Sequence, residues 1–178
     1  RKQAAKELKP GTVLDLGSGT GASYSDLKNF DVTALDPDEK MLSLNNFKKK
    51  VVGIGEELPF KENSFDNVLC CFVWRNMSDT EKALSEVYRV LKPGGKFILL
   101  DMTRPKNFFL KLLHKIGTFA LLHFVGFITF NLKEYRFLYE SLDFYPQPED
   151  HLTEDKYENL LIHRIGLFDF VYLAVFTK

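Results

Sequence analysis

A glycine-rich turn after the first apolar run constrains the fold of this chain more than any other feature. Residues 12–16 (Thr-Val-Leu-Asp-Leu) are followed at once by Gly17, Gly19 and Gly21. Glycine has no Cβ, so it turns tightly and lets a ligand approach the backbone. Open parallel sheets bind ligands beyond the carboxyl ends of their strands, where such turns lie. The turn therefore predicts a parallel α/β sheet with a ligand site at this edge.

Predicted strands and helices alternate along most of the chain, which indicates a doubly wound parallel sheet. The predicted strands are residues 12–16, 32–35, 51–54, 65–73 and 96–102. The predicted helices are residues 1–9, 22–30 and 38–46, and one that begins at a Ser78–Glu81 capping box and ends at Pro93. Residues 157–165 and 168–177 are strand-like and separated by a short turn near Gly166, which predicts an antiparallel hairpin. The expected fold is a Rossmann-like seven-stranded sheet, with five parallel strands, a C-terminal antiparallel hairpin and helices on both faces.

Length, charge and cysteine content restrict the class of protein. A chain of 178 residues has room for one core, so we expect a single domain over residues 1–178. Its formal net charge is zero, whereas a nucleic-acid partner requires a basic surface, so none is expected. Cys70 and Cys71 are adjacent in an apolar run and fit no metal-ligand spacing. We therefore expect no metal, reduced thiols and a cytoplasmic location, since no secretory signal opens the chain.

The spacing and charge of the glycine turn distinguish between nucleotide ligands. The pattern is G-x-G-x-G, whereas dinucleotide-binding turns have G-x-G-x-x-G. Asp15 precedes the first glycine by two residues; it would repel a pyrophosphate but suits the ammonium and sulfonium groups of S-adenosylmethionine. Asp36 ends the next predicted strand, where its carboxylate can accept from both ribose hydroxyls. These residues favour S-adenosylmethionine over a dinucleotide, and over a turn that binds nothing.

On these residues the chain resembles the class I S-adenosylmethionine-dependent methyltransferases. The motifs that carry the resemblance are residues 13–21, Asp36, 58–60, 64–66 and 88–95. The resemblance implies methyl transfer that leaves S-adenosylhomocysteine. The cofactor-binding residues that it implies are Asp15, Gly17, Ser18, Gly19, Thr20, Gly21, Asp36, Pro37, Met41, Gly55, Glu56, Glu57 and Phe72.

Within that class, the chain is similar to the ubiquinone/menaquinone-biosynthesis C-methyltransferase-like group. The similarity covers Arg75-Asn76, residues 89–103 and residues 135–141. Two departures stand out: the N-terminal signature of that group is absent, and Ile54 occupies the place of the acid that usually takes the adenine amino group. We expect backbone groups and Glu56 or Glu57 to hold adenine here, with Ile54 packing on the ring.

The resemblance suggests a catalytic role for Arg75 and Asn76. A phenolic ring that attacks through carbon needs its hydroxyl deprotonated or polarised, so Arg75 would stabilise the phenolate and Asn76 would orient it. The alternative is that the pair serves as a loop residue and a helix cap. The predicted function is methyl transfer to a small apolar or aromatic acceptor, with C-methylation of a quinol-like ring as the specific form. An N- or O-methyltransferase for another small metabolite and a non-catalytic cofactor-binding module are the alternatives.

Phenylalanines gather in residues 104–145, which form a predicted insertion between the fifth and sixth strands. They are Phe108, Phe109, Phe119, Phe124, Phe127 and Phe130. The apolar stretch near residues 118–130 is shorter than the ~18–20 residues that a membrane span needs, and His123 interrupts it, so no transmembrane segment is expected. By the resemblance this insertion is a helical lid over the acceptor pocket. It would also serve as an apolar wall for an isoprenoid or aromatic acceptor, with peripheral contact to a bilayer as a further reading.

Overall fold

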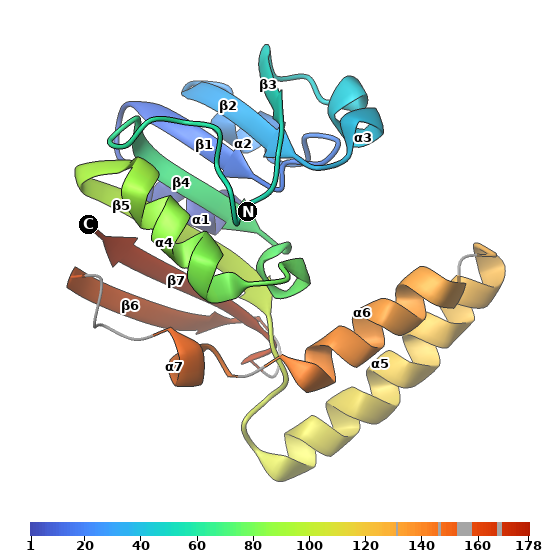
Figure 1. Cartoon of the computed structure of the whole chain (residues 1–178). Coiled ribbons are helices and arrows are strands. Elements are labelled where there is room, and N and C mark those ends of the chain that lie inside the picture. The colour runs from blue at the N-terminus through green and yellow to red at the C-terminus, as the bar shows by residue number, and fades with distance from the viewer. Residues whose placement is uncertain (131, 146, 153–157, 167–168) are drawn as a thin grey trace. The chain divides into compact units, whose positions relative to one another are not determined.

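A computed structural model of the chain contains one seven-stranded sheet with the order β3-β2-β1-β4-β5-β7-β6 (Figure 1). The structure describes residues 1–130, 132–145, 147–152, 158–166 and 169–178. The strands are β1 (Thr12–Leu16), β2 (Asp31–Asp36), β3 (Lys49–Val52), β4 (Phe65–Cys71), β5 (Leu91–Met102), β6 (Glu158–Ile165) and β7 (Val171–Thr177). The first five are parallel, and an antiparallel hairpin completes the sheet. The predicted fold class is confirmed, while the predicted strand ends Tyr157 and Phe168 fall outside the described residues.

The described residues also form seven α-helices and one 3-10 turn. They are α1 (Lys2–Lys6), α2 (Tyr24–Leu27), α3 (Glu39–Leu44), η1 (Trp74–Asn76), α4 (Thr80–Val90), α5 (Phe108–Ile128), α6 (Leu132–Phe144) and α7 (Pro148–His151). In Figure 1, α4 lies over one face of the parallel strands, and α1 and α2 lie over the other. The central strands β1 and β4 are buried almost throughout, as expected where helices cover both faces of a sheet.

The chain divides into two compact units. The first comprises Arg1–Asp101, the described part of Thr153–His163, and Leu173–Lys178. The second comprises Met102–Leu152 and the described part of Arg164–Tyr172. The glycine turn belongs to the first unit, and the predicted insertion, residues 104–145, falls inside the second. The role of that insertion as a lid stays a prediction.

Several predicted boundaries were wrong, and the sheet register explains two of them. β3 runs from Lys49 to Val52, two residues earlier than predicted, because Lys49 pairs with Thr33 and Val52 with Asp36 of β2. β5 begins at Leu91, before the Pro-Gly-Gly sequence, and Leu91 pairs with Phe65 of β4. The helix predicted over residues 22–30 is only the single turn α2.

The predicted capping box at Ser78–Glu81 is also wrong. The N-cap of α4 is Asp79, whose Oδ1 accepts a hydrogen bond from the backbone N–H of Lys82 at 2.9 Å. Ser78 instead donates both its backbone N–H and its hydroxyl to Glu56, at 2.8 and 2.9 Å. Ser78 therefore binds Glu56, 22 residues away in the sequence, and does not cap the helix as the local pattern predicted.

Helix α5 is longer than the apolar stretch that the sequence suggested. It has 21 residues, and by length and composition it is apolar enough to cross a membrane. None of its most apolar window is buried. The sequence-based stretch, residues 118–130, therefore underestimated the length of the apolar helix. Apolar residues continue back to Phe108, and the polar residues among them, Lys111, His114 and Lys115, lie on one side of the helix.

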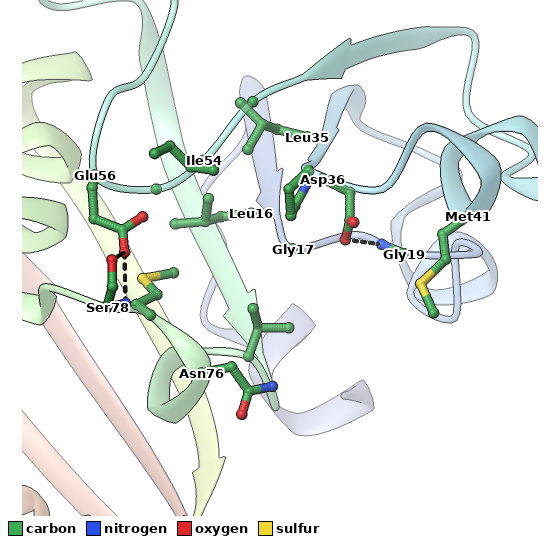
Figure 2. Close-up of a pocket in the computed structure, with 15 residues that line it drawn as sticks. Leu16, Gly17, Gly19, Leu35, Asp36, Met41, Ile54, Glu56, Asn76 and Ser78 are labelled. Atoms are coloured by element: carbon green, nitrogen blue, oxygen red, sulfur yellow. Dashed lines mark hydrogen bonds between the residues drawn. The ribbon is translucent and has the colours of Figure 1, made fainter. Parts of the chain in front are cut away.

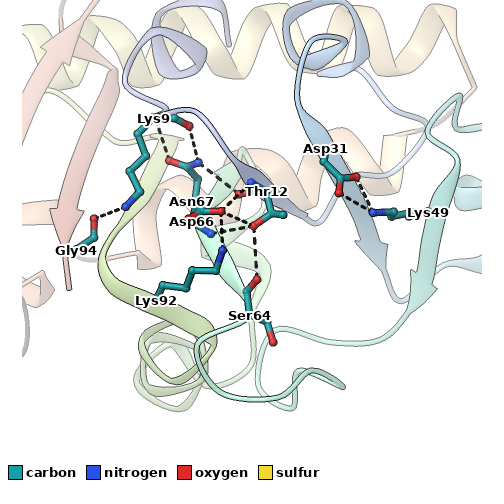
Figure 3. Close-up of polar contacts among 9 residues, drawn as sticks. All are labelled: Lys9, Thr12, Asp31, Lys49, Ser64, Asp66, Asn67, Lys92 and Gly94. Atoms are coloured by element: carbon teal, nitrogen blue, oxygen red, sulfur yellow. Dashed lines mark hydrogen bonds and ion pairs between the residues drawn. The ribbon is translucent and has the colours of Figure 1, made fainter.

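Asp66 joins three strands at the amino-terminal edge of the parallel sheet (Figure 3). Its Oδ2 accepts from the backbone N–H and the hydroxyl of Thr12, both at 2.9 Å, and from Lys92 Nζ at 2.8 Å. The Lys92 and Thr12 donors lower the pKa of Asp66 to about 2. These contacts tie β1 and β5 to β4 at the edge opposite the glycine turn.

We expect Asp66→Asn to lower the free energy of unfolding by about 1–2 kcal/mol at pH 7, since it removes charge-assisted hydrogen bonds. The pKa of Asp66 is depressed in the folded protein, so its contribution is present above pH ~4 and disappears as the pH falls towards 2. Urea unfolding at pH 7 and pH 3 measures both effects. Asp31→Asn is the matched control, because its ion pair with Lys49 is exposed and should contribute under ~0.5 kcal/mol (Figure 3). Equal losses in the two variants would contradict the prediction.

Candidate functional site

A cavity of about 510 Å³ opens at the carboxyl ends of β1 and β2, beside the glycine turn (Figure 2). Its size lies within the range of about 300–1,000 Å³ that small-molecule sites occupy. It belongs entirely to the first unit of the chain. Its lining residues are Leu16, Gly17, Gly19, Leu35, Asp36, Pro37, Met41, Gly53, Ile54, Gly55, Glu56, Val73, Asn76, Met77 and Ser78.

The glycine turn forms the floor of this cavity and is held against the end of β2. The backbone N–H groups of Gly17 and Ser18 both donate to the carbonyl of Leu35, at 2.8 and 3.0 Å. Gly17 has φ +70°, and a Cβ on it would stand 2.5 Å from Cγ1 of Val73. Both the backbone angle and the space therefore require glycine here, as the sequence indicated.

Asp36 ends β2 at the cavity wall. Its Oδ2 accepts from the backbone N–H of Gly19 at 2.8 Å, and its Oδ1 accepts from that of Asp38 at 2.9 Å. Figure 2 shows the first of these bonds crossing the edge of the cavity. A carboxylate has about four lone-pair sites, so one bond to each oxygen leaves acceptor capacity for hydroxyl groups. Asp36 thus offers acceptor positions at the cavity wall, and its contact with a ribose stays a prediction.

Asp15 lies beneath the turn and does not line the cavity. It is only 1% exposed, and burial raises its pKa to about 6. The Ser18 hydroxyl donates to it at 2.7 Å and in turn accepts from Asn45 Nδ2 at 2.8 Å. This chain of hydrogen bonds fixes the turn from below, and a contact between Asp15 and a cofactor ammonium stays a prediction.

Apolar side chains form the walls of the cavity. Ile54 and Met41 both line the cavity, and they are 46% and 47% exposed. Leu16, Leu35 and Val73 add further apolar surface. Ile54 therefore lines an apolar wall of the cavity, and its packing on an adenine ring stays a prediction.

Of the two acids predicted to hold adenine, Glu56 and Glu57, only Glu56 lines the cavity. Glu56 lines the cavity, but its Oε1 accepts from Ser78 and from the backbone N–H of Asp79, so it anchors the loop before α4 (Figure 2). These donors lower its pKa against the effect of burial. Glu57 is exposed and outside the lining.

Arg75 and Asn76 follow β4 in the turn η1. The Arg75 guanidinium is paired with Asp101 of β5, and the Arg75 backbone N–H also donates to Asp101, at 3.1 Å. The two side chains are 6% and 0% exposed. Asn76 lines the cavity (Figure 2). Arg75 thereby fixes the turn that presents Asn76.

The structure brings together about half of the predicted site residues. Those that line the cavity are Gly17, Gly19, Asp36, Pro37, Met41, Gly55, Glu56 and Asn76. Those that do not are Asp15, Ser18, Thr20, Gly21, Glu57, Phe72 and Arg75. Six further lining residues were not predicted from the sequence: Leu16, Leu35, Gly53, Val73, Met77 and Ser78. For Leu16, Leu35, Gly53 and Val73, a position at or next to the end of a predicted strand was the available signal, whereas Met77 and Ser78 lie four and five residues beyond such an end. Within the described part of the chain, no group of three or more His, Cys, Asp or Glu side chains could hold a metal.

The fold is that of S-adenosylmethionine-dependent methyltransferases. A crystal structure from Thermotoga maritima, titled an S-adenosylmethionine-dependent methyltransferase and possible histamine N-methyltransferase, superposes with a TM-score of 0.71 at 23% identity. The match covers 99% of this chain and 87% of that one. A protein from Pyrococcus horikoshii superposes with a TM-score of 0.65 at 22% identity over 95% and 83% of the two chains. At these identities the similarity concerns the fold.

Residues 2–156 match the ubiE/COQ5 methyltransferase family, and the chain belongs to that family. It is 36% identical to the ubiquinone/menaquinone biosynthesis C-methyltransferase UbiE of Rickettsia felis, and 38% identical to the protein of that name from Rickettsia typhi. Each match covers 78% of this chain and 63% of the relative. The chain thus spans less than two thirds of the length of these curated relatives.

We expect Gly17→Ala to lower the free energy of unfolding by about 2 kcal/mol or more beyond the loss in Gly94→Ala. Both glycines have positive φ, +70° and +69°, so both substitutions strain the backbone. Only the new methyl group at position 17 meets a neighbour, since nothing lies within 4 Å of a Cβ at Gly94. Thermal and urea unfolding of both variants measure the difference. Equal destabilisation would show that close packing against Val73 does not matter.

Proposed function

We propose that the chain binds S-adenosylmethionine in the cavity beside the glycine turn and transfers its methyl group to a small apolar acceptor. The observation that carries the proposal is the position of Asp36, a nearly buried carboxylate with unused acceptor capacity at the cavity edge. The glycine turn contacts it through the backbone N–H of Gly19, and the chain belongs to a methyltransferase family. The specific acceptor that we propose is a quinol-like ring, methylated at carbon. Support for this comes from the curated relatives, which are named as C-methyltransferases of ubiquinone and menaquinone biosynthesis.

The residues of the cavity fit this cofactor. Asp36 would accept from the ribose hydroxyls, Gly17 and Gly19 allow close approach to the backbone, and Ile54 would pack on adenine. The cofactor supplies a methyl group already activated by its sulfonium, so placement is the main task of the protein. Cytoplasm is the compartment that we expect for this reaction.

On the acceptor side, we assign orientation of the acceptor oxygen to Asn76, because its side chain lines the cavity. Arg75 acts as a positioning residue, since its backbone N–H and guanidinium both bind the buried Asp101 and so hold the turn η1. This assignment differs from the sequence-based hypothesis that Arg75 itself stabilises a phenolate. A guanidinium in a buried ion pair is already neutralised, which weakens its attraction for a second anion.

Calorimetry of the full chain with S-adenosylmethionine and S-adenosylhomocysteine tests the cofactor. We expect both to bind, and Asp36→Asn to weaken binding roughly tenfold, because hydrogen bonds to a charged acceptor contribute more than those to a neutral one. Asp31→Asn, at the opposite end of the same strand, is the matched control and should bind normally. Absence of binding by the unmodified chain would overturn the proposal. Binding of the cofactor without methyl transfer to a demethylated quinol would support a non-catalytic cofactor-binding module. Methyl transfer to a nitrogen or oxygen acceptor would show that the chain is an N- or O-methyltransferase and that a quinol is not its acceptor.

The affinity for S-adenosylmethionine should rise with pH if the predicted contact between Asp15 and the cofactor ammonium forms. The pKa of Asp15 is about 6, so most of it is protonated at pH 5 and ionised at pH 7.5. Because the ammonium binds the ionised form, we expect roughly tenfold weaker binding at pH 5. Calorimetry at both pH values measures this, and Asp15→Asn should abolish the difference. The same pH dependence in that variant would remove Asp15 from cofactor binding.

A further inference from the structure

The loop that follows β3 forms the end of the cavity next to Asp36. Asp36 pairs with Val52 in the register of β2 and β3, and the backbone N–H of Gly53 donates to the Asp36 carbonyl at 3.2 Å. Ile54, which comes next in the chain, lines the cavity, as does Gly55 (Figure 2). In a nucleoside the base and the diol share one ribose. A ligand whose diol binds Asp36 would therefore have its base within reach of this loop.

Apolar side chains surround this end of the cavity. Leu16 and Leu35, near the ends of β1 and β2, lie on the same side of the cavity as Ile54 in Figure 2. On the other side, Met77 lines the cavity close to Gly55, where a Cβ would stand 3.0 Å from Cε of Met77. Apolar surfaces of this kind suit a flat purine ring, because contact removes both the ring faces and the side chains from water.

The polar side chains near this end are already bonded to one another. Among the described residues that line the cavity, those with polar side chains are Asp36, Glu56, Asn76 and Ser78. The Oε1 atom of Glu56 accepts from the backbone N–H and the hydroxyl of Ser78, and from the backbone N–H of Asp79 at 3.3 Å (Figure 2). Glu56 is also nearly buried. Its carboxylate therefore serves the loop before α4, while Ile54 presents only hydrocarbon to a base.

This arrangement determines which parts of a purine nucleoside the protein can recognise. A site built to hydrogen-bond an amino group rejects an analogue that lacks it, whereas an apolar pocket discriminates weakly between ligands of similar shape. The diol has an acceptor in Asp36, but the 6-amino group of an adenine beside Ile54 would meet a methyl-bearing side chain. Ile54 is about half exposed, so an amino group there keeps its hydrogen bonds to water and loses little by having no protein partner.

We infer that this end of the cavity binds a purine nucleoside by the faces of its ring and leaves the 6-amino group of adenine without a protein partner. Ile54 is the residue that determines this tolerance. The inference rests on the proposed function, because it concerns the base of the same cofactor. It goes further in the class of ligand that it assigns, which is a purine nucleoside with a free ribose diol, whether or not position 6 carries an amine.

Calorimetry of the full chain with two ligands tests the inference. One is S-adenosylhomocysteine, and the other is its purine analogue, in which hydrogen replaces the 6-amino group and the ring nitrogens stay acceptors. We expect the two dissociation constants to differ by less than about fivefold, because an apolar pocket discriminates weakly. A larger loss of affinity for the analogue would overturn the inference and leave the proposed function standing. Absence of binding by S-adenosylhomocysteine itself would overturn the proposed function and the inference with it.

Substitutions of Ile54 supply the second arm. Ile54→Asp should favour S-adenosylhomocysteine over the analogue by roughly tenfold, since a charged acceptor then meets the amine. Ile54→Ala should weaken both ligands by the same factor, since it removes contact with the ring alone. The matched control is Leu44→Asp, at a leucine of α3 that is 70% exposed and outside the cavity lining, and it should leave both affinities unchanged. Both positions are exposed, and circular dichroism confirms folding.

Two outcomes of this arm contradict the inference. If Ile54→Asp leaves the ratio of the two affinities unchanged, the amine does not lie beside position 54. If Ile54→Ala binds both ligands as tightly as the unmodified chain does, the base lies elsewhere in the cavity.

Discussion

The attachment of the glycine turn to the end of β2 is the contact on which the rest of the site depends. Gly17 and Ser18 donate to one carbonyl of β2, and Gly19 donates to the carboxylate of Asp36. Beneath them, Asp15, Ser18 and Asn45 form a buried chain of hydrogen bonds. A turn with three glycines would otherwise have many conformations, so these bonds are what convert it into a defined cavity floor.

The far wall of the cavity depends on two carboxylates that bind donors from later parts of the chain. Glu56 accepts from Ser78 and fixes the entry to α4, while Asp101 holds Arg75 and with it the turn η1. Both acids are buried, and buried carboxylates require such partners. The loops that follow β3 and β4 are therefore held in place by hydrogen bonds and charge pairing, and Asn76 faces the cavity as a result.

The two units of the chain use apolar residues in opposite ways. In the first unit, the apolar side chains of β1 and β4 fill a core between helices, as in other doubly wound sheets. In the second unit, the buried Arg104 is paired with Asp143 of α6, while the phenylalanines of α5 are exposed.

The sequence by itself determined the parallel strands, the glycine turn and the place of Asp36, because each depends on local periodicity or on the backbone freedom of a single residue. It also indicated the family, through motifs that match along most of the chain. Only the tertiary structure decided which polar groups are paired. Ser78 reads as a helix cap and Arg75 as a free cation, yet their partners, Glu56 and Asp101, are 22 and 26 residues away. The order and register of strands select those partners, and no local pattern records them. The same reason explains why the apolar cavity walls, and the outward face of α5, became visible only in the folded chain.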